Sequence, residues 1–152
     1  MPSFSQVKIL PYSPAELFYL VLDVEAYPKF LPWCAAAKII SKNNEQIIAE
    51  LVLRVKGFSE KYQSSVTCKI LDGERYLINV EAISGPFKYL KNIWQFSPDV
   101  KGSLVEFNID FKMQSIILDK LIGGYFVKAT EKMINAFEKR AGEVLSLDHI
   151  LS

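Results

Sequence analysis

The N-terminal part of the chain predicts an extended start followed by two short helices. Residues 3–10 form the extended start. Ser13, Pro14 and Glu16 then match the pattern of a helix N-terminus, with a capping residue, a proline in the first turn and an acidic residue three positions after the cap. Apolar residues continue at helical spacing, and residues 23–27 form a second short turn that prolines terminate.

Apolar and polar residues alternate with a period of two from residue 38 to residue 113. The alternation is clearest over residues 49–55, 58–70 and 105–113, where most of the alternate side chains are apolar. Short glycine-containing turns separate the alternating segments, which indicates that neighbouring strands run antiparallel. The pattern predicts a meander of five or six strands, and a sheet of six to seven strands once the N-terminal strand is included.

The period changes back to that of a helix near Ser115. The expected helix is roughly 30 residues long, and Gly123 and Gly124 mark a place where it kinks or approaches the sheet closely. Its apolar stripe consists of Leu118, Ile122, Tyr125, Ala129, Met133, Ala136 and Phe137.

These elements predict an α+β fold in which a curved antiparallel sheet wraps around one long C-terminal helix. We expect a single domain over residues 1–145 and a short C-terminal tail over residues 146–152. Because one helix does not fill the concave face of a wide sheet, a cavity lined by aromatic side chains is expected between the two.

Composition narrows the functional classes. The 152 residues include 18 Lys and Arg against 17 Asp and Glu, so general neutralisation of phosphates is not expected and DNA is not an expected partner. No apolar run approaches the roughly 20 residues of a membrane helix, and the N-terminus lacks the pattern of a targeting signal, which predicts a cytoplasmic protein. The cysteines Cys34 and Cys68 are expected to be free thiols.

The sequence offers little for catalysis. It contains no glycine-rich nucleotide-binding motif, and its single histidine, His149, lies near the C-terminus, away from any Ser or Cys nucleophile motif. Two cysteines and one histidine are a poor ligand set for zinc. Acid/base chemistry by carboxylates paired across strands stays open, because such pairs are not visible in a sequence. The expectation is a protein that needs no cofactor and no metal.

Several motifs resemble one known family. Residues 23–34 are similar to the D-x-x-x-Y-P-x-F-(L/V)-P-W-C signature of the START-like coenzyme-Q-binding proteins, a family that includes the bacterial ribosome association toxins. Residues 84–96, 105–111 and 136–141 are similar too, so the resemblance spans nearly the whole chain in order. It implies the helix-grip fold of the polyketide cyclase superfamily, with an apolar tunnel under the C-terminal helix.

The resemblance implies two functions. The first-ranked one is non-catalytic binding of ubiquinone or a similar prenylated lipid, in support of respiratory electron transport or quinone biosynthesis, with transient contact to the inner membrane or a respiratory enzyme. The alternative is a ribosome-binding regulator that binds the large subunit and blocks association of the subunits. A cyclase-type enzyme is the third and weakest hypothesis.

Candidate site residues follow from the inward faces and the expected tunnel. They are Tyr27, Phe30, Trp33, Leu53, Tyr62, Val80, Trp94, Phe107, Phe111, Ile122, Tyr125, Phe126, Ala129 and Met133. Each has an alternative interpretation as ordinary core packing, and the aromatics of residues 27–33 either gate the tunnel or close the top of the core. Glu60, Lys88 and Lys91 are candidates for a polar rim, with solvated positions as their alternative.

Overall fold

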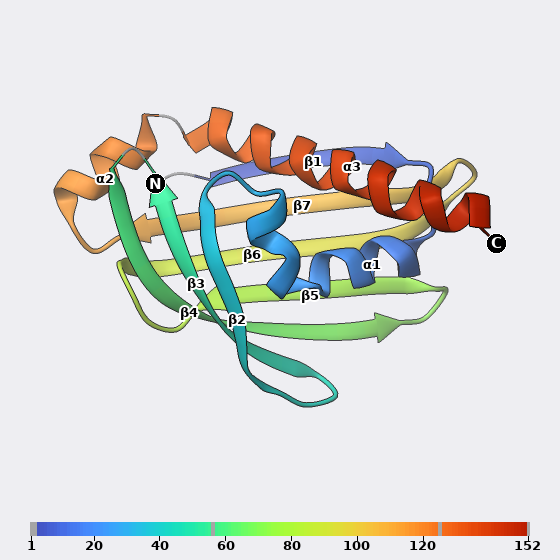
Figure 1. Cartoon of the computed structure of the whole chain (residues 1–152), viewed down its shortest axis with the longest axis horizontal. Coiled ribbons are helices and arrows are strands. Elements are labelled where there is room, and N and C mark those ends of the chain that lie inside the picture. The colour runs from blue at the N-terminus through green and yellow to red at the C-terminus, as the bar shows by residue number, and fades with distance from the viewer. Residues whose placement is uncertain (1–2, 56, 125, 152) are drawn as a thin grey trace.

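The computed structural model describes residues 3–55, 57–124 and 126–151, with side chains described to residue 145 except at residue 55. Figure 1 shows one curved sheet with helices on its concave side. In chain order the elements are β1 (Ser3–Leu10), α1 (Pro14–Leu22), the 3-10 helix η1 (Val24–Lys29), β2 (Cys34–Lys42), β3 (Gln46–Val55), β4 (Phe58–Leu71), β5 (Arg75–Ala82), β6 (Phe87–Asp99), β7 (Gly102–Met113), α2 (Ile116–Gly123) and α3 (Phe126–Leu151).

The sheet is an open antiparallel meander, and the first strand, β1, forms the edge next to the last strand, β7. Strands β2 to β7 pair with their neighbours in chain order, and β1 pairs with β7 to give the order β1-β7-β6-β5-β4-β3-β2. The α+β helix-grip architecture with seven strands is therefore confirmed. Glycines with positive φ stand in the connections between strands, at Gly57 (+81°) and Gly73 (+73°), as the turn pattern predicts.

The N-terminal helices form as the capping pattern predicts. The Ser13 hydroxyl accepts a hydrogen bond from the Glu16 amide at 3.2 Å, and the Ser13 amide donates to the Glu16 carboxylate at 3.0 Å. This reciprocal pair satisfies amides that a helix start otherwise leaves free. The hydroxyl of Tyr27 on η1 donates to the backbone carbonyl of Val21 on α1, which fixes the two short helices relative to each other.

The C-terminal helical segment differs from the expected single helix of about 30 residues. It is divided into α2, with eight residues, and α3, with 26. Helix α2 ends at Gly123 with Gly124 as its C-cap, and α3 begins at Phe126. The glycine pair lowers helix propensity at this point by about 1 kcal/mol per glycine relative to alanine. The hydroxyl of Ser115 caps α2 by accepting from the Leu118 amide at 3.2 Å, yet α2 has no buried side chain. Tyr125 lies outside the described residues.

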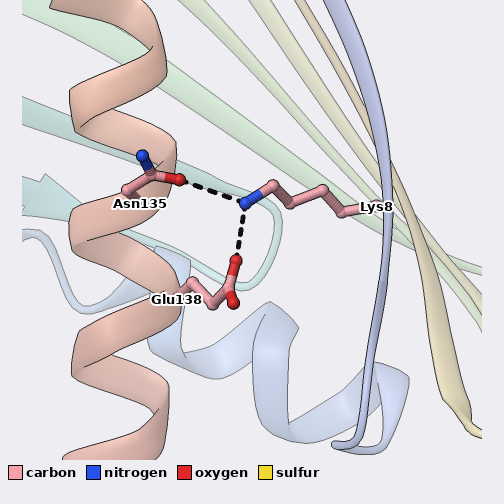
Figure 2. A network of polar contacts seen from close by, with 3 residues as sticks. All are labelled: Lys8, Asn135 and Glu138. Carbon is pink, nitrogen blue, oxygen red and sulfur yellow. Dashed lines mark hydrogen bonds and ion pairs between the residues drawn. The ribbon is translucent and has the colours of Figure 1, made fainter.

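Helix α3 is held over the edge of the sheet by both polar and apolar contacts. The Lys8 ammonium of β1 donates to Asn135 at 3.1 Å and to Glu138 at 2.6 Å. Figure 2 shows these contacts between β1 and α3. Because these groups are partly exposed, the ion pair adds little stability and mainly fixes position. Two residues of α3 itself, Ala141 and Leu145, are buried in the hydrophobic core. The α3 backbone continues to Leu151, and the division between domain and tail at residue 145 stays a prediction.

Gly85 occupies a position where no other residue fits without strain. Its φ is +103°, and a Cβ there would lie 3.0 Å from the Lys61 carbonyl oxygen and collide with the Cβ of Tyr62. We expect Gly85→Ala to lower the free energy of unfolding by about 1–3 kcal/mol, measured by urea denaturation. The matched control is Gly123→Ala, where a Cβ meets nothing within 4 Å and no loss of stability is expected. Equal midpoints for the two variants would contradict this account of Gly85.

Candidate functional site

A cavity of about 190 Å³ lies between the concave face of the sheet and the helices. Strands β3 to β7 form its floor, and α1, η1, α2 and α3 supply the other walls. Ser64, Ile78 and Trp94 are buried at the floor, whereas Ala129 is exposed and Met133 is half-buried on the side of α3. The cavity is therefore closed on the sheet side and open beside α3.

Eleven of the predicted site residues stand on this wall. They are Tyr27, Trp33, Leu53, Tyr62, Val80, Trp94, Phe111, Ile122, Phe126, Ala129 and Met133. The strand residues among them share the concave face because alternate side chains on a strand point to the same side. Their placement on the wall is a fact of the geometry, and their role in binding a ligand stays a prediction. Tyr125 lies outside the described residues.

Phe30 and Phe107 are not on the wall of this cavity. Phe30 packs edge-on against Phe137 with ring centroids 5.1 Å apart, and the Arg140 guanidinium lies 5.5 Å from the centre of its ring. Phe107 lies behind Trp94 at 4.7 Å, beside a second cavity of about 30 Å³ that has room for only one or two waters. Both positions favour the alternative interpretation of core packing.

The aromatic segment after α1 lies partly on the wall of the cavity and partly over the core, and its role as a gate stays a prediction. Tyr27 lines the cavity and also packs edge-on against Phe137 at 5.4 Å, and the half-buried Trp33 stands on the wall as well. Phe30, three residues after Tyr27, covers the core instead. The segment is thus partly wall and partly plug, which the sequence presents as alternatives.

The three residues of the predicted polar rim do not line the cavity. Glu60, Lys88 and Lys91 are exposed, and none of them lies on the wall. Glu60 pairs in register with Leu53, a wall residue, but it sits near the end of β4 where its carboxylate reaches water. Their positions favour the solvated interpretation for all three.

Twelve wall residues were not among the candidates, and most carry a recognisable signal. Ser64 and Val66 alternate with Tyr62 on β4, so the shared face of one strand identifies them. Phe87 has no such signal, because a register irregularity between Phe87 and Tyr89 interrupts the alternation in β6. The full set is Val21, Val24, Leu51, Ser64, Val66, Ile78, Phe87, Leu90, Asn92, Ile109, Thr130 and Phe137.

The wall of the cavity is largely apolar, and its polar side chains are uncharged. Its described residues include no Asp, Glu, Lys, Arg or His. Burial raises the pKa of the Tyr27 and Tyr62 hydroxyls, so both remain protonated at neutral pH. Within the described part of the chain, no three His, Cys, Asp or Glu side chains come together as ligands for a metal ion. Such a wall suits an uncharged, largely hydrophobic ligand.

Cys34 lies next to this region as a buried free thiol, and Cys68 is a partly exposed one. Burial raises the pKa of Cys34 to about 11, so at pH 8 only about one thiol in a thousand is ionised. We expect iodoacetamide at pH 8 to alkylate Cys68 before Cys34 in the folded protein, followed by peptide mass spectrometry. In urea the two cysteines should react at similar rates. Faster labelling of Cys34 in the folded protein would contradict its burial.

The same pKa shift has a consequence for stability. Because the folded-state pKa of Cys34 lies above its usual value of 9.0, the neutral thiol contributes fully to stability below about pH 9. That contribution is lost as the pH rises through about 11, where the buried thiolate would have to form.

None of the helices in the described ranges is both long enough and apolar enough to cross a membrane.

Comparison with known proteins relates the chain to one family over most of its length. The profile described as "Polyketide cyclase / dehydrase and lipid transport" matches residues 10–138. The chain is 61% identical over 145 residues to the ribosome association toxin RatA of Rickettsia prowazekii, covering 95% of this chain and 99% of that protein. It is 31% identical to the RatA protein of Escherichia coli K12 over 147 residues, covering 96% and 90% of the two chains.

More distant similarity extends to quinone-binding and lipid-transfer proteins. The mitochondrial coenzyme Q-binding protein homolog B of Xenopus laevis is 28% identical, and the match covers 93% of this chain but 58% of that protein. Among solved structures, an 18 kDa protein of Caulobacter crescentus has a TM-score of 0.73 and 34% identity, covering 96% and 99% of the two chains. A STAR-related lipid transfer protein fragment of Xanthomonas axonopodis has a TM-score of 0.78 at 14% identity, covering 91% and 84%, and shows the shared fold.

Proposed function

Since the chain belongs to the polyketide cyclase/dehydrase and lipid transport family, and within it to the ribosome association toxins, we propose that it is a non-catalytic binding protein that regulates the association of ribosomal subunits. The observation that carries this proposal is 61% identity over 99% of the length of the Rickettsia prowazekii toxin. Similarity of that extent spans the helices and the sheet alike. The target we propose is the large subunit.

This ranking reverses the one that the sequence alone favours. Binding of ubiquinone comes first on the motifs, but the coenzyme Q-binding relative is only 28% identical and more than a third of it has no counterpart in this chain. The ribosome association toxins of Rickettsia prowazekii and Escherichia coli match over 99% and 90% of their own lengths. We therefore place the ribosome first and the quinone second.

Sucrose-gradient sedimentation tests the proposal. Purified protein is added to separated bacterial subunits before magnesium is raised to drive them together, and the gradient fractions are probed for the protein. We expect free subunits to persist and the protein to sediment with the large subunit. As a control, the protein is incubated with the small subunit alone, where we expect it to stay at the top of the gradient. Unchanged monosomes, with the protein absent from the large-subunit fractions, would contradict the proposal.

A second function is favoured by the cavity itself. An open space of about 190 Å³ without a charged residue on its described wall supports binding of a hydrophobic ligand, with ubiquinone or a related prenylated lipid as the candidate. The protein would hold such a molecule for respiratory electron transport or for quinone biosynthesis. The two functions are compatible, because the ligand would lie inside the fold and a ribosome would contact its surface.

Lipid extraction tests this second function. Protein purified from a bacterial host without detergent is extracted with organic solvent, and the extract is analysed by mass spectrometry. We expect a neutral lipid in stoichiometric amount. A protein that is empty after mild purification, and that takes up no lipid when supplied with it, would contradict the proposal.

We place the protein in the bacterial cytoplasm, where ribosomes are present. Loading of the cavity would require transient contact with the inner membrane surface or with a respiratory enzyme. No catalytic step is proposed for either function.

A further inference from the structure

Some polar groups on the cavity wall already make hydrogen bonds within the protein, and others do not. Tyr27 donates its hydroxyl to a backbone carbonyl of α1, and Thr130 donates to a carbonyl four residues earlier in α3 at 2.8 Å. Asn92 accepts from the Trp94 indole at 2.9 Å and donates to a carbonyl of β7 at 2.9 Å. The Trp33 side chain is only partly buried. The Tyr27, Thr130 and Asn92 groups therefore have little left to offer a ligand, whereas the indole N–H of Trp33 is an uncommitted donor on the half-buried part of the wall.

Two hydroxyls on β4 remain. Tyr62 and Ser64 are 7% and 3% exposed and stand on the wall. Their hydroxyls make no hydrogen bond with any residue that the structure describes. Ser64 pairs in register with Ala49 and Ala82, whose methyl groups offer no partner. Neither oxygen is among the buried polar atoms that lack a partner, so both reach open space, and on this wall that space is the cavity. They are therefore available to donate hydrogen bonds to a ligand.

The geometry fixes where these hydroxyls can act. Alternate residues of a strand point to the same face, so Tyr62 and Ser64 both point toward the concave side. The Tyr62 ring is held by an edge-on contact to Phe87, with centroids 5.2 Å apart. Burial raises the pKa of the Tyr62 hydroxyl, which keeps its proton available for donation.

We infer that Tyr62 and Ser64 form the polar subsite of the cavity and bind an uncharged hydrogen-bond acceptor, a carbonyl oxygen, on a ring-sized apolar head group. This inference rests on the proposed ligand-binding function of the cavity and specifies its ligand class. A carbonyl oxygen has two lone pairs and matches two hydroxyl donors.

The charge and size of the cavity select against other head groups. A carboxylate or phosphate would be buried with no cation on the described wall to compensate it, at a cost of several kcal/mol. A cavity of about 150 Å³ holds one benzene ring, so about 190 Å³ accommodates a single substituted ring while an attached chain leaves beside α3. The subsite therefore favours neutral carbonyl compounds over fatty acids and phospholipid head groups.

Three probes that differ only in the head group test the inference. They are 4-propylacetophenone, propylbenzene and 4-propylbenzoate, with affinities measured by isothermal titration calorimetry at pH 7.5. We expect the ketone to bind the parent protein about ten-fold or more tightly than propylbenzene, and the benzoate to bind most weakly. In the Tyr62→Phe/Ser64→Ala variant the ketone should lose that advantage while propylbenzene binds as before.

Thermal unfolding without ligand provides the check on folding. Because the two hydroxyls have no partner in the fold, the double variant should unfold at the same temperature as the parent or higher. Tyr76→Phe, which also removes a tyrosine hydroxyl but lies off the wall, is the matched control and should leave all three affinities unchanged.

The outcomes distinguish failure of the Tyr62 and Ser64 subsite from failure of the proposed ligand-binding function. If propylbenzene and the ketone bind equally, or the double variant keeps the preference for the ketone, the subsite is overturned while the cavity remains a binding site. Equal affinity for the benzoate and the ketone would overturn the selection against charge. If none of the probes binds the parent protein, both the subsite and the ligand-binding function fail.

Discussion

Replacing Trp94 with alanine is expected to lower the free energy of unfolding by about 3–5 kcal/mol, the range for truncating a large buried aromatic residue. The indole is 5% exposed and sits at the centre of an aromatic cluster. Its ring lies 4.7 Å from Phe107, 5.1 Å from Phe137 and 6.0 Å from Phe96, and its N–H donates to Asn92 at 2.9 Å. Alanine would remove these contacts and leave Asn92 without its donor.

Urea denaturation followed by far-ultraviolet circular dichroism measures this effect. A loss of that size is a large part of the total stability of a domain, so the variant should be partly unfolded at moderate temperature. Val100→Ala is the control, because Val100 is fully exposed in the turn between β6 and β7 and should change the midpoint little. An unchanged midpoint for Trp94→Ala would contradict the placement of this ring in the core.

The sequence predicts the sheet well because its signals are local and repeated. The alternation in β7 places Phe107 and Phe111 on one face, and the structure buries both. Glycine turns such as the one at Gly73 set the antiparallel order. Once the strands and the C-terminal helix are known, few arrangements bury all the apolar faces, so the helix-grip fold follows from the pattern.

The cavity is harder to predict because it depends on side chains from distant segments. Trp94 and Phe107 share an inward orientation, but only the first lines the cavity, since the second lies behind it. The sequence shows which face of a strand points inward, but it does not show whether an inward side chain lines the cavity or packs behind its wall. Ser64 illustrates a second limit, because an isolated serine in a strand is ordinary until its neighbours Ala49 and Ala82 are seen to offer it no partner.

The division between α2 and α3 is predicted from the sequence only in part. The glycine pair predicts a weak point in the helix, but helix propensity alone does not tell a kink from a complete break. What decides the outcome is packing, and α2 has no buried side chain while α3 carries Phe137 and Ala141 into the core. Exposed apolar residues at Ile116 and Ile117 follow from the same lack of packing.

Substituting Ala129 with tryptophan is expected to abolish ligand binding while leaving the fold intact. Ala129 stands on the wall of the cavity, one turn of α3 from Met133, and its side chain is exposed. In a filled core an added indole would overpack and destabilise by about 1–3 kcal/mol or more. Beside an open cavity it has room, and it occupies the space that the ligand would otherwise use.

The matched control is Val127→Trp, which introduces the same indole two residues earlier, at an exposed position off the wall. Both variants should unfold close to the temperature of the parent protein, but only Ala129→Trp should lose its bound lipid, by at least about ten-fold as measured by extraction and mass spectrometry. Strong destabilisation of Ala129→Trp would mean that this face of α3 packs against a filled core. A stable variant that keeps its lipid would show that the ligand lies elsewhere. Because the cavity stays below α3 while a ribosome would meet the protein from outside, Ala129→Trp should still act on ribosomal subunits, which separates the two proposed functions in one variant.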